Sequence, residues 1–523
     1  MKIGALKEIT SGEKRVALTP DSATHLQKLG HECLVEKDAG LAAGFSDAQY
    51  IAVGVEISTT AEALTKASDV IVKVRPPSAA EVNRLSSSMT LISFFHPDAN
   101  EALMELAKSK EASVIAMDMV PRIGRAQKMD ALSSMANIAG YRAVIEAGNN
   151  FGRFFTGQMT AAGKVPPAKV LVIGAGVAGL AAIGTSTSLG AITYAFDVRP
   201  EVAEQVESMG AEFVFLDFAD EQADGASTGG YAAVSSPEFT AAQLAKFREI
   251  APEMDIVITT ALIPNREAPE LWTSDMVASM KPGSVIVDLA AEKGGNCKLT
   301  VIDERIVTDN GVVIIGCADF PSRMAAQAST MYASNIRHMI ADLTPEKDGV
   351  IVHDMEDDVI RGATVVNAGE ITFPPPPPKI QAIAAKPKEK APDKTPEEIH
   401  ADEIAAFKKQ TKNQVKLLAF GAALILLVGS YAPSSFMQHF IVFVLSVFVG
   451  FQVIWNVSHS LHTPLMAVTN AISSIIILGA LLQVGSTSFI VILLAAISLL
   501  LAGINIFGGF LVTKRMLTMF QKS

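Results

Sequence analysis

The amino-acid sequence predicts two doubly wound α/β domains with parallel sheets, followed by an all-α membrane domain. Three observations support this prediction. Strand-like apolar runs alternate with helical stretches in two successive series before residue 373, as in parallel sheets that helices cover on both faces. Five consecutive prolines follow at Pro374–Pro378. No Asp, Glu, Lys or Arg then occurs between Leu417 and Thr513, which is typical of membrane spans.

The first domain is expected to comprise residues 1–135 and 323–372, and is therefore discontinuous. It opens with a strand at Lys2–Leu6 and a helix that begins at Thr19-Pro20-Asp21 and ends near Gly30. A Thr cap before Pro is a helix start signal, and a Gly just beyond the last turn is a stop signal. The other elements expected here are strands at 32–36, 70–74 and 91–95, and a return through the helix 323–343 to a closing segment at 350–372. A long helix over 131–151 is expected to lead from this domain into the second.

The second domain is expected at residues 136–322. Its strand-like runs recur with helical stretches between several of them, so it is predicted to be a second doubly wound unit. The runs are Val170–Ile173, Ile192–Phe196, Glu212–Phe215, Ile256–Thr259, Val285–Asp288 and Val312–Ile315.

A Gly-x-Gly-x-x-Gly turn directly follows the first of these strands, at Gly174, Gly176 and Gly179, and opens a helical stretch. Such glycines let the backbone approach a pyrophosphate, which then lies at the positive end of the helix. Asp197 ends the next strand, where a carboxylate can bind both ribose hydroxyls and favours NAD over NADP. Arg199 nearby weakens that discrimination. The alternative is that the glycines only pack a helix on a sheet.

A polar segment lies between a strand-like run and the long helical stretch, and it contains Arg122, Gln127 and Asp130. Loops at the carboxyl ends of parallel strands line ligand crevices. These side chains could therefore orient a nicotinamide and its ribose. By residue type alone, a solvated loop with a salt bridge is the better interpretation.

The segment Gly225–Tyr231 is small, glycine-rich and ends in an aromatic residue. This composition suits a lid that closes over a ligand. It suits an ordinary surface loop equally well.

Residues 373–414 are expected to form a linker that is rich in Pro, Lys and Glu, ending in a short juxtamembrane helix. The membrane domain is expected at 415–513, with spans at about 415–432, 436–457, 465–484 and 489–512, and a basic tail at 514–523. Lysines precede the first span, and Lys514, Arg515 and Lys522 follow the last. Positive flanks place both ends in the cytoplasm.

Few polar groups in this tail could serve chemistry. Asn456, His459 and His462 lie at the end of the second expected span and in the following loop. An imidazole at membrane depth is a candidate for a proton path. A hydrated histidine at the interface is the commoner case, and we favour it here.

The charge distribution excludes some classes of function. Residues 1–416 contain 40 of the 43 basic residues and all 54 acidic ones, a formal charge of −14. An acidic body argues against a nucleic-acid partner. The three cysteines are scattered without a C-x-x-C, so neither a disulfide framework nor a structural metal site is expected. The N-terminus lacks a signal peptide, so the body is expected to stay in the reducing cytoplasm.

The sequence closely resembles the alpha subunit of the proton-translocating NAD(P) transhydrogenase family along essentially its whole length. The resemblance rests on several long blocks in order. They are Lys7-Glu8 with Arg15–Pro20, Pro121–Asp130, Ser133–Arg142, Gly174–Gly179, Asp288–Cys297 and Ile504–Phe510.

The resemblance implies two Rossmann-like domains and specific cofactor contacts. The family's Arg-Gln-Asp loop, which approaches the nicotinamide, matches Arg122, Gln127 and Asp130, with Ser133 nearby. Its phosphate turn matches the glycines, its ribose carboxylate matches Asp197, and its mobile lid matches Gly229-Gly230-Tyr231. Further contacts implied by position are Lys128, Met129, Val177, Val198, Arg199, Gln243 and Leu262.

The family's reaction is direct hydride transfer between NADH and NADP, coupled to proton movement across the membrane. Only one dinucleotide fingerprint is visible in this chain. The resemblance therefore implies NAD(H) on this chain and NADP(H) on a separate beta subunit. It also implies an alpha2beta2 heterotetramer in the bacterial inner membrane.

Two alternatives remain open at this point. The body also resembles alanine dehydrogenase, in which Arg15, Lys73 and His96 would match substrate-binding and catalytic positions. The membrane tail argues against a soluble dehydrogenase. A membrane-tethered NAD sensor would bind the cofactor without transferring hydride.

Overall fold

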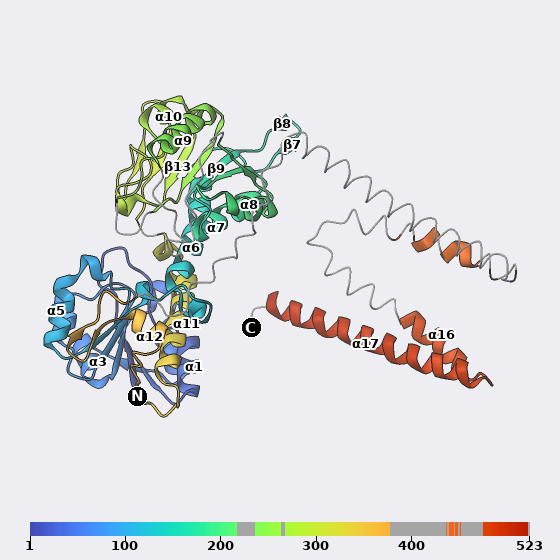
Figure 1. The fold of residues 1–523 in the computed structure, drawn as a ribbon, viewed down its shortest axis with the longest axis horizontal. Coiled ribbons are helices and arrows are strands. Elements are labelled where there is room, and N and C mark those ends of the chain that lie inside the picture. The colour runs from blue at the N-terminus through green and yellow to red at the C-terminus, as the bar shows by residue number, and fades with distance from the viewer. Residues whose placement is uncertain are drawn as a thin grey trace. The chain divides into compact units, whose positions relative to one another are not determined.

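The computed structural model describes residues 1–216, 236–262, 267–318 and 320–376, short pieces between 433 and 450, and the stretch 474–520. The chain divides into two compact units, Met1–Lys388 and Glu389–Ser523. The first unit contains two α/β domains, each built around one large sheet (Figure 1).

The first domain is built on an eight-stranded sheet. Its strands are β1 (Lys2–Ala5), β2 (Glu32–Glu36), β3 (Glu56–Ser58), β4 (Val70–Val72), β5 (Thr90–Ser93), β6 (Ser113–Ala116), β16 (Thr364–Asn367) and β17 (Glu370–Ile371). Their order is β17-β16-β6-β5-β4-β1-β2-β3. Strands β1 to β6 pair in parallel, whereas β16 pairs antiparallel with β6 and with β17. The chain thus returns to the first sheet after it has formed the second.

The first helix follows its local sequence signals closely. It is α1 (Pro20–Lys28), and the Thr19 side chain accepts a hydrogen bond from the backbone N–H of Ser22 in a capping box. Beyond its end Gly30 has a φ of +88°. The other helices of this domain are α2 (Asp47–Ala52), α3 (Ala61–Ala67), α4 (Ala79–Asn83), α5 (Glu101–Ser109) and α12 (Asp358–Ala363), with 3₁₀ turns η1 (Leu41–Ala43), η2 (Pro97–Ala99), η3 (Met117–Met119) and η4 (Gly124–Met129).

The second domain is built on a seven-stranded sheet. Its strands are β9 (Lys169–Ile173), β10 (Ile192–Phe196), β11 (Glu212–Phe213), β12 (Ile256–Thr259), β13 (Val285–Asp288), β14 (Arg305–Val307) and β15 (Val313–Ile315). Their order is β11-β10-β9-β12-β13-β15-β14, and only β14 runs antiparallel to its neighbour among the described strands. Strands β12, β13 and β15 are buried along their whole length, as expected where helices cover both faces.

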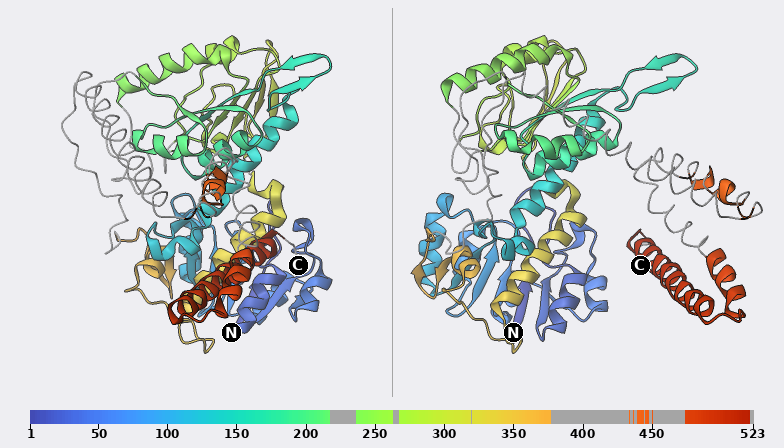
Figure 2. Two further views of the ribbon diagram at one scale, coloured as in Figure 1. Left: turned by 90° about the vertical axis from the view of Figure 1, so that its right-hand side faces the viewer. Right: turned by 45° about the vertical axis from the view of Figure 1, so that its right-hand side comes forward.

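The second domain also has a projecting ribbon. Strands β7 (Gln158–Thr160) and β8 (Gly163–Val165) form an antiparallel hairpin that extends from the domain (Figure 2). The helices here are α7 (Val177–Ser188), α8 (Ala203–Ser208), α9 (Pro237–Ile250) and α10 (Ser274–Ser279), with 3₁₀ turns η5 (Pro200–Val202), η7 (Ala251–Glu253), η8 (Ala291–Lys293) and η9 (Pro321–Met324).

Two long helices connect the domains along the chain, α6 (Ala131–Asn150) and α11 (Ala325–Leu343). Helix α6 packs against both α11 and α7. It approaches α7 closely at Gly140, where an added Cβ would lie 1.9 Å from the carbonyl oxygen of Ala178. Only glycine permits that approach.

The structure corrects the expected fold at the edges of the sheets. The parallel sheets are present, but β14, β16 and β17 make antiparallel edges, and β3, β7, β8 and β14 were not expected from the sequence. In the second unit the structure describes α16 (Ser474–Val484) and α17 (Phe489–Phe520). The described part of the chain contains no helix that is both long enough and apolar enough to cross a membrane. The first expected span lies outside the described residues, as do Asn456, His459 and His462.

Candidate functional site

The glycine turn lies where the order of the second sheet reverses. Strand β9 pairs with β10 on one side and with β12 on the other, and such a switch point is where open α/β sheets bind ligands. Gly174 has a φ of +100°. A Cβ at Gly179 would lie 1.7 Å from the carbonyl oxygen of Gly174, whereas a Cβ at Gly176 would meet no atom within 4 Å. Gly179 therefore allows the turn to close, and Gly176 leaves its outer side open.

The first turn of α7 offers backbone N–H groups to an anion. Gly176 is its N-cap residue, with no side-chain cap hydrogen bond. The initial N–H groups of a helix have no intrahelical partner and attract phosphate. Val177 opens the helix and is exposed. This arrangement can accept a phosphate group.

Asp197 connects the end of β10 to this turn. Its Oδ2 accepts a hydrogen bond of 2.7 Å from the backbone N–H of Ala175, and its Oδ1 accepts one of 2.9 Å from the N–H of Arg199. The Arg199 guanidinium donates to both oxygens, from Nε at 2.9 Å and from Nη2 at 3.1 Å. The hydrogen bond from Arg199 to Asp197 raises the pKa of the guanidinium.

These four bonds use the whole acceptor capacity of the carboxylate, since an ionised carboxyl group accepts about four hydrogen bonds. The Asp197 side chain is buried against the turn, and Val198 beside it is half-buried. A ribose hydroxyl can therefore reach Asp197 only if the Arg199 side chain releases one of its contacts.

A second buried carboxylate organises the opposite side of the switch point. Asp288 at the end of β13 accepts hydrogen bonds from Thr259, Thr300 and the backbone N–H groups of Ala290 and Cys297. Because all of these donors come from the protein, Asp288 acts as an internal brace. Its side chain ties the end of β12 to the segment between β13 and β14.

Asn296 braces the loop after β12. Its side-chain oxygen accepts from the N–H of Ala261 at 3.1 Å, and its Nδ2 donates to the carbonyls of Ala261 and Pro269. Leu262, next to Ala261, is exposed. The roles of Asp288 and Asn296 were not predicted, although both lie in the block Asp288–Cys297, because the spacing of residues in one sequence does not reveal hydrogen bonds between distant loops.

Gln243 lies within the described part of the chain, whereas the expected lid does not. Gln243 is buried on α9 beside the aromatic core of that face. Gly229 and Tyr231 lie outside the described residues. Their assigned contacts stay predictions.

The Arg-Gln-Asp loop forms η4 and the N-cap of α6. Asp130 accepts hydrogen bonds from the backbone N–H of Ser133 at 2.8 Å and from its hydroxyl at 2.6 Å. It therefore caps the helix with Ser133 as its partner. Arg122 and Gln127 are exposed on this loop.

Met129 and Lys128 of the same loop make contacts inside the first domain. The Met129 side chain is fully buried in the core of the first domain, so only its backbone remains available to a cofactor. The Lys128 ammonium lies 2.9 Å from a carboxylate oxygen of Asp342 on α11. The structure thus gives these two residues structural contacts that their sequence positions did not indicate.

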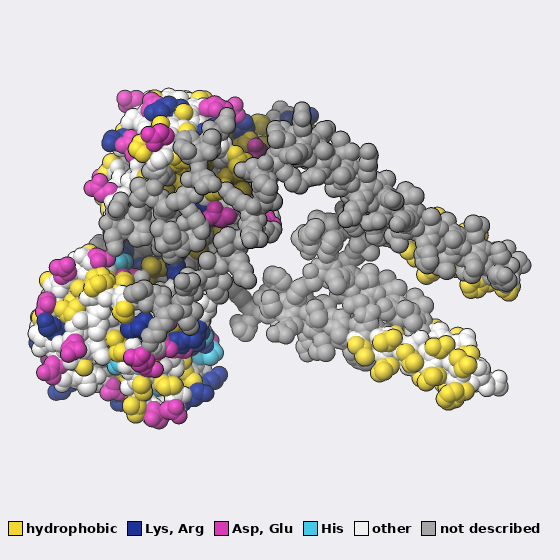
Figure 3. All heavy atoms as spheres, in the orientation of Figure 1, with side chains coloured by type: hydrophobic (Ala, Val, Ile, Leu, Met, Phe, Trp, Pro, Cys, Tyr) yellow, Lys and Arg dark blue, Asp and Glu magenta, His cyan; other side chains and the backbone are white. Residues whose placement is uncertain are grey.

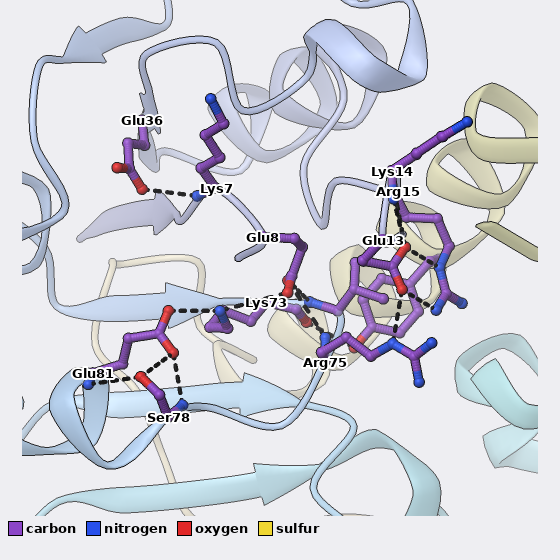
Figure 4. Close-up of polar contacts among 12 residues, drawn as sticks. Lys7, Glu8, Glu13, Lys14, Arg15, Glu36, Lys73, Arg75, Ser78 and Glu81 are labelled. Carbon is purple, nitrogen blue, oxygen red and sulfur yellow. Dashed lines mark hydrogen bonds and ion pairs between the residues drawn. The ribbon is translucent and has the colours of Figure 1, made fainter. Parts of the chain in front are cut away.

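The positions that resemble alanine dehydrogenase follow strands of the first sheet at their carboxyl ends, and Figure 4 shows two of them, Arg15 and Lys73, with their partners. The Arg15 guanidinium is paired with Glu13 through Nε at 2.8 Å and Nη2 at 2.6 Å. Burial opposes ionisation of Glu13, but the hydrogen bond and charge of Arg15 outweigh it and lower the pKa of this carboxyl to about 2.

Lys73 is paired in the same way. It is only 1% exposed, and its Nζ lies 2.6 Å from Glu81 Oε1 and 3.5 Å from Glu8 Oε2. Burial raises the pKa of Glu8. Arg15 and Lys73, the two basic residues that resemble alanine dehydrogenase positions, therefore both form ion pairs with carboxylates of this chain.

His96 completes this group after β5. Its backbone is left-handed, with a φ of +50°. Its Nδ1 lies 3.4 Å from Asp118, which also accepts hydrogen bonds from the N–H groups of Phe95 and His96. Among the described residues no cluster of His, Cys, Asp or Glu could hold a metal ion.

Known proteins match this chain along its whole length. Family models described as the N-terminal and C-terminal domains of alanine dehydrogenase/PNT match residues 4–139 and 143–374. The NAD(P) transhydrogenase subunit alpha of Cereibacter sphaeroides is 74% identical over 524 residues, covering all of both chains. The chain belongs to the NAD(P) transhydrogenase alpha-subunit family.

Solved structures and the tail agree with this family membership. The crystal structure of a transhydrogenase from Sinorhizobium meliloti is 38% identical with a TM-score of 0.62, covering 72% of this chain and 99% of that one. An L-alanine dehydrogenase structure is 26% identical with a TM-score of 0.60, covering 72% and 97%. A model described as the 4TM region of pyridine nucleotide transhydrogenase matches residues 439–522.

Proposed function

We propose that this chain is the NAD(H)-binding subunit of a proton-translocating transhydrogenase. With a partner beta subunit that binds NADP(H), it transfers hydride directly between NADH and NADP⁺ and couples this transfer to proton movement. One observation supports this above all others. The glycine turn with Asp197 behind it occurs in a chain that aligns end to end with a transhydrogenase alpha subunit.

The residues of the second domain fit a dinucleotide. The outer side of Gly176 is open, and α7 begins without a side-chain cap, so a pyrophosphate can approach the N–H groups. Asp197 lies at the ribose position and would bind its hydroxyls after Arg199 moves. The other residues proposed to hold NAD(H) are Gly174, Gly179, Val177, Val198, Gly229, Tyr231, Gln243 and Leu262.

Catalysis in this proposal is a matter of position. When bound, the dihydronicotinamide supplies the hydride. Arg122 and Gln127 orient its carboxamide and ribose, and Asp130 with Ser133 holds the loop at the start of α6. Bringing the two reactants together without water between them can supply most of the barrier reduction, about 7–11 kcal/mol in well-oriented systems.

The partner and the assembly are proposed from the family to which the chain belongs. The chain has one dinucleotide fingerprint, so NADP(H) is assigned to the beta subunit. Two alpha and two beta subunits are proposed, with no nucleic acid.

The tail is proposed to span the bacterial inner membrane four times, with both ends in the cytoplasm. Apolar side chains gather on the described parts of α16 and α17 (Figure 3). Leu482 and Phe489 are 76% and 77% exposed, as suits contact with lipid rather than water. The alternative role of Asn456 and His459 in a proton path stays a prediction from the sequence, and both lie outside the described residues.

The test uses membrane vesicles that contain the chain together with its beta subunit. NADH-driven reduction of an NADP analogue is followed optically, with and without an uncoupler. We expect reduction whose rate changes when the proton gradient collapses. Cofactor binding without hydride transfer would instead indicate a sensor, and robust reductive amination of pyruvate would indicate an alanine dehydrogenase.

A further inference from the structure

The loop that contains Gln127 exposes four of its six residues to solvent. It is a six-residue 3₁₀ turn, η4, without a side-chain cap. Only Ala126 and Met129 are buried in it. Since 3₁₀ turns have poorer hydrogen-bond geometry than α-helices, contacts from outside the turn must help to hold it.

Helix α11 provides those contacts on both sides of Gln127. Asp342 is 13% exposed, and its two oxygens receive Arg125 Nη1 at 2.8 Å and Lys128 Nζ at 2.9 Å. Arg125 precedes Gln127 by two residues and Lys128 follows it by one. One carboxylate therefore holds the turn on either side of the residue assigned to the nicotinamide.

A second residue of α11 holds the backbone of the turn. Asn335 lies seven residues before Asp342 and so on the same face of the helix. Its Nδ2 donates a hydrogen bond of 3.0 Å to the carbonyl of Lys128. Its Oδ1 is buried without a hydrogen-bond partner, which costs stability. An apolar residue would avoid that cost, so the contribution of the amide is its bond to the turn.

Helix α12 adds a third attachment. Asp357 caps α12 by accepting from the N–H groups of Val359 and Ile360, and it also pairs with Arg125. Burial opposes ionisation of Asp357, but these backbone hydrogen bonds and Arg125 outweigh it and hold its pKa below the usual value. Arg125 is thus shared between two carboxylates on two helices.

We propose that Asp342 is a positioning residue for hydride transfer. By binding Arg125 and Lys128 it sets where Gln127 lies, and it does so without touching the cofactor. The proposal rests on the proposed function, in which Gln127 orients the nicotinamide. The two cations that Asp342 binds, Arg125 and Lys128, are 47% and 43% exposed. Ion pairs with cations exposed to solvent contribute little to global stability, so the effect of Asp342 is local to the turn.

The test compares Asp342→Asn with a matched control, Asp255→Asn. Asp255 also binds cations, with Arg153 Nη1 at 2.9 Å and Lys281 Nζ at 3.8 Å. It precedes β12 and so lies at the amino ends of the strands, the edge opposite the glycine turn. Both variants are made in the full chain with its beta subunit in vesicles. The rate of hydride transfer, the Kd for NADH and the thermal midpoint are measured for each.

We expect Asp342→Asn to lower the transfer rate about tenfold, because a small misplacement at a reacting centre is costly, while the Kd for NADH changes less than twofold. Asp342→Glu should recover much of the rate. Asp255→Asn should lower the thermal midpoint at least as much and leave the rate unchanged. When Arg125→Gln and Asp342→Asn are combined in one chain, the transfer rate should fall by less than the product of the two single fold-losses, because both substitutions remove the same contact.

Two results would overturn the proposal. An unchanged rate in a folded Asp342→Asn variant is one, and a rate loss that only parallels lost NADH affinity without recovery by Asp342→Glu is the other. Gln127→Asn separates this failure from that of the proposed function. If Gln127→Asn slows transfer and Asp342→Asn does not, only the positioning role fails. If Gln127→Asn has no effect, the role assigned to the loop fails, and the inference fails with it.

Discussion

The close approach of α6 and α7 at Gly140 connects the stability of the body to cofactor binding. In Gly140→Ala, the new Cβ would lie 1.9 Å from the carbonyl oxygen of Ala178, and real Cβ atoms essentially never come nearer than 3.0 Å. The helices must therefore separate by about 1.1 Å, and overpacking of this kind costs about 1–3 kcal/mol. Helix propensity offsets about 1 kcal/mol of that cost.

The displaced residue belongs to the first turn of α7, which is proposed to bind the pyrophosphate. We therefore expect Gly140→Ala to weaken NADH binding about tenfold, equivalent to about 1.4 kcal/mol, besides lowering the thermal midpoint. Gly148→Ala, in the same helix, is the control. Its Cβ would meet only the Phe155 ring, at 3.1 Å, so it should be neutral or stabilising.

The assay is NADH titration by fluorescence together with thermal unfolding of both variants in detergent. If Gly140→Ala binds NADH as tightly as Gly148→Ala and unfolds at the same temperature, the helix contact does not position the turn. The reasoning about α6 would then be refuted.

Three further predictions concern single side chains. Gln127→Asn should cut hydride transfer far more than NADH affinity, and equal losses in single-turnover and binding measurements would contradict its positioning role. Asp197→Asn should weaken NADH binding and improve binding of NADPH relative to NADH, because it removes the negative charge while Arg199 remains; unchanged selectivity in titrations with both cofactors would count against it. For Glu13, the pKa is lowered to about 2 from 4.5 in the folded chain, so its stabilisation is present above pH 4.5 and is lost as the pH falls towards 2. A pKa difference of this size corresponds to about 3 kcal/mol of stabilisation. The free energy of unfolding measured in urea should therefore rise as the pH is raised from 2 to 4.5, and Glu13→Gln should lack this rise.

Local signals allowed much of the fold to be predicted. The capping box at Thr19, the stop at Gly30 and the glycine turn at Gly174 depend on residues within a few positions of one another, so the sequence displays them directly. The buried parallel strands are continuous apolar runs, which the sequence also displays directly. Their first residues were therefore predicted to within one position.

The site could be predicted only in part, because its supports are distant in sequence. Asp342 contacts Lys128 across 214 positions, and Asn296 holds Ala261 across 35. Neither contact leaves a periodic or motif signal. The buried side chain of Met129 shows the same limit, since a residue inside a recognised motif can belong to the core.

The return of the chain to the first sheet has a consequence for synthesis on the ribosome. Strand β6 ends at Ala116, and its partner β16 begins at Thr364. At about 5–20 residues per second, β6 waits roughly 12–50 s with one edge unpaired while the entire second domain is made and folds. The second domain can thus complete its sheet before the first domain receives β16, and until then β6 has one edge without a partner strand.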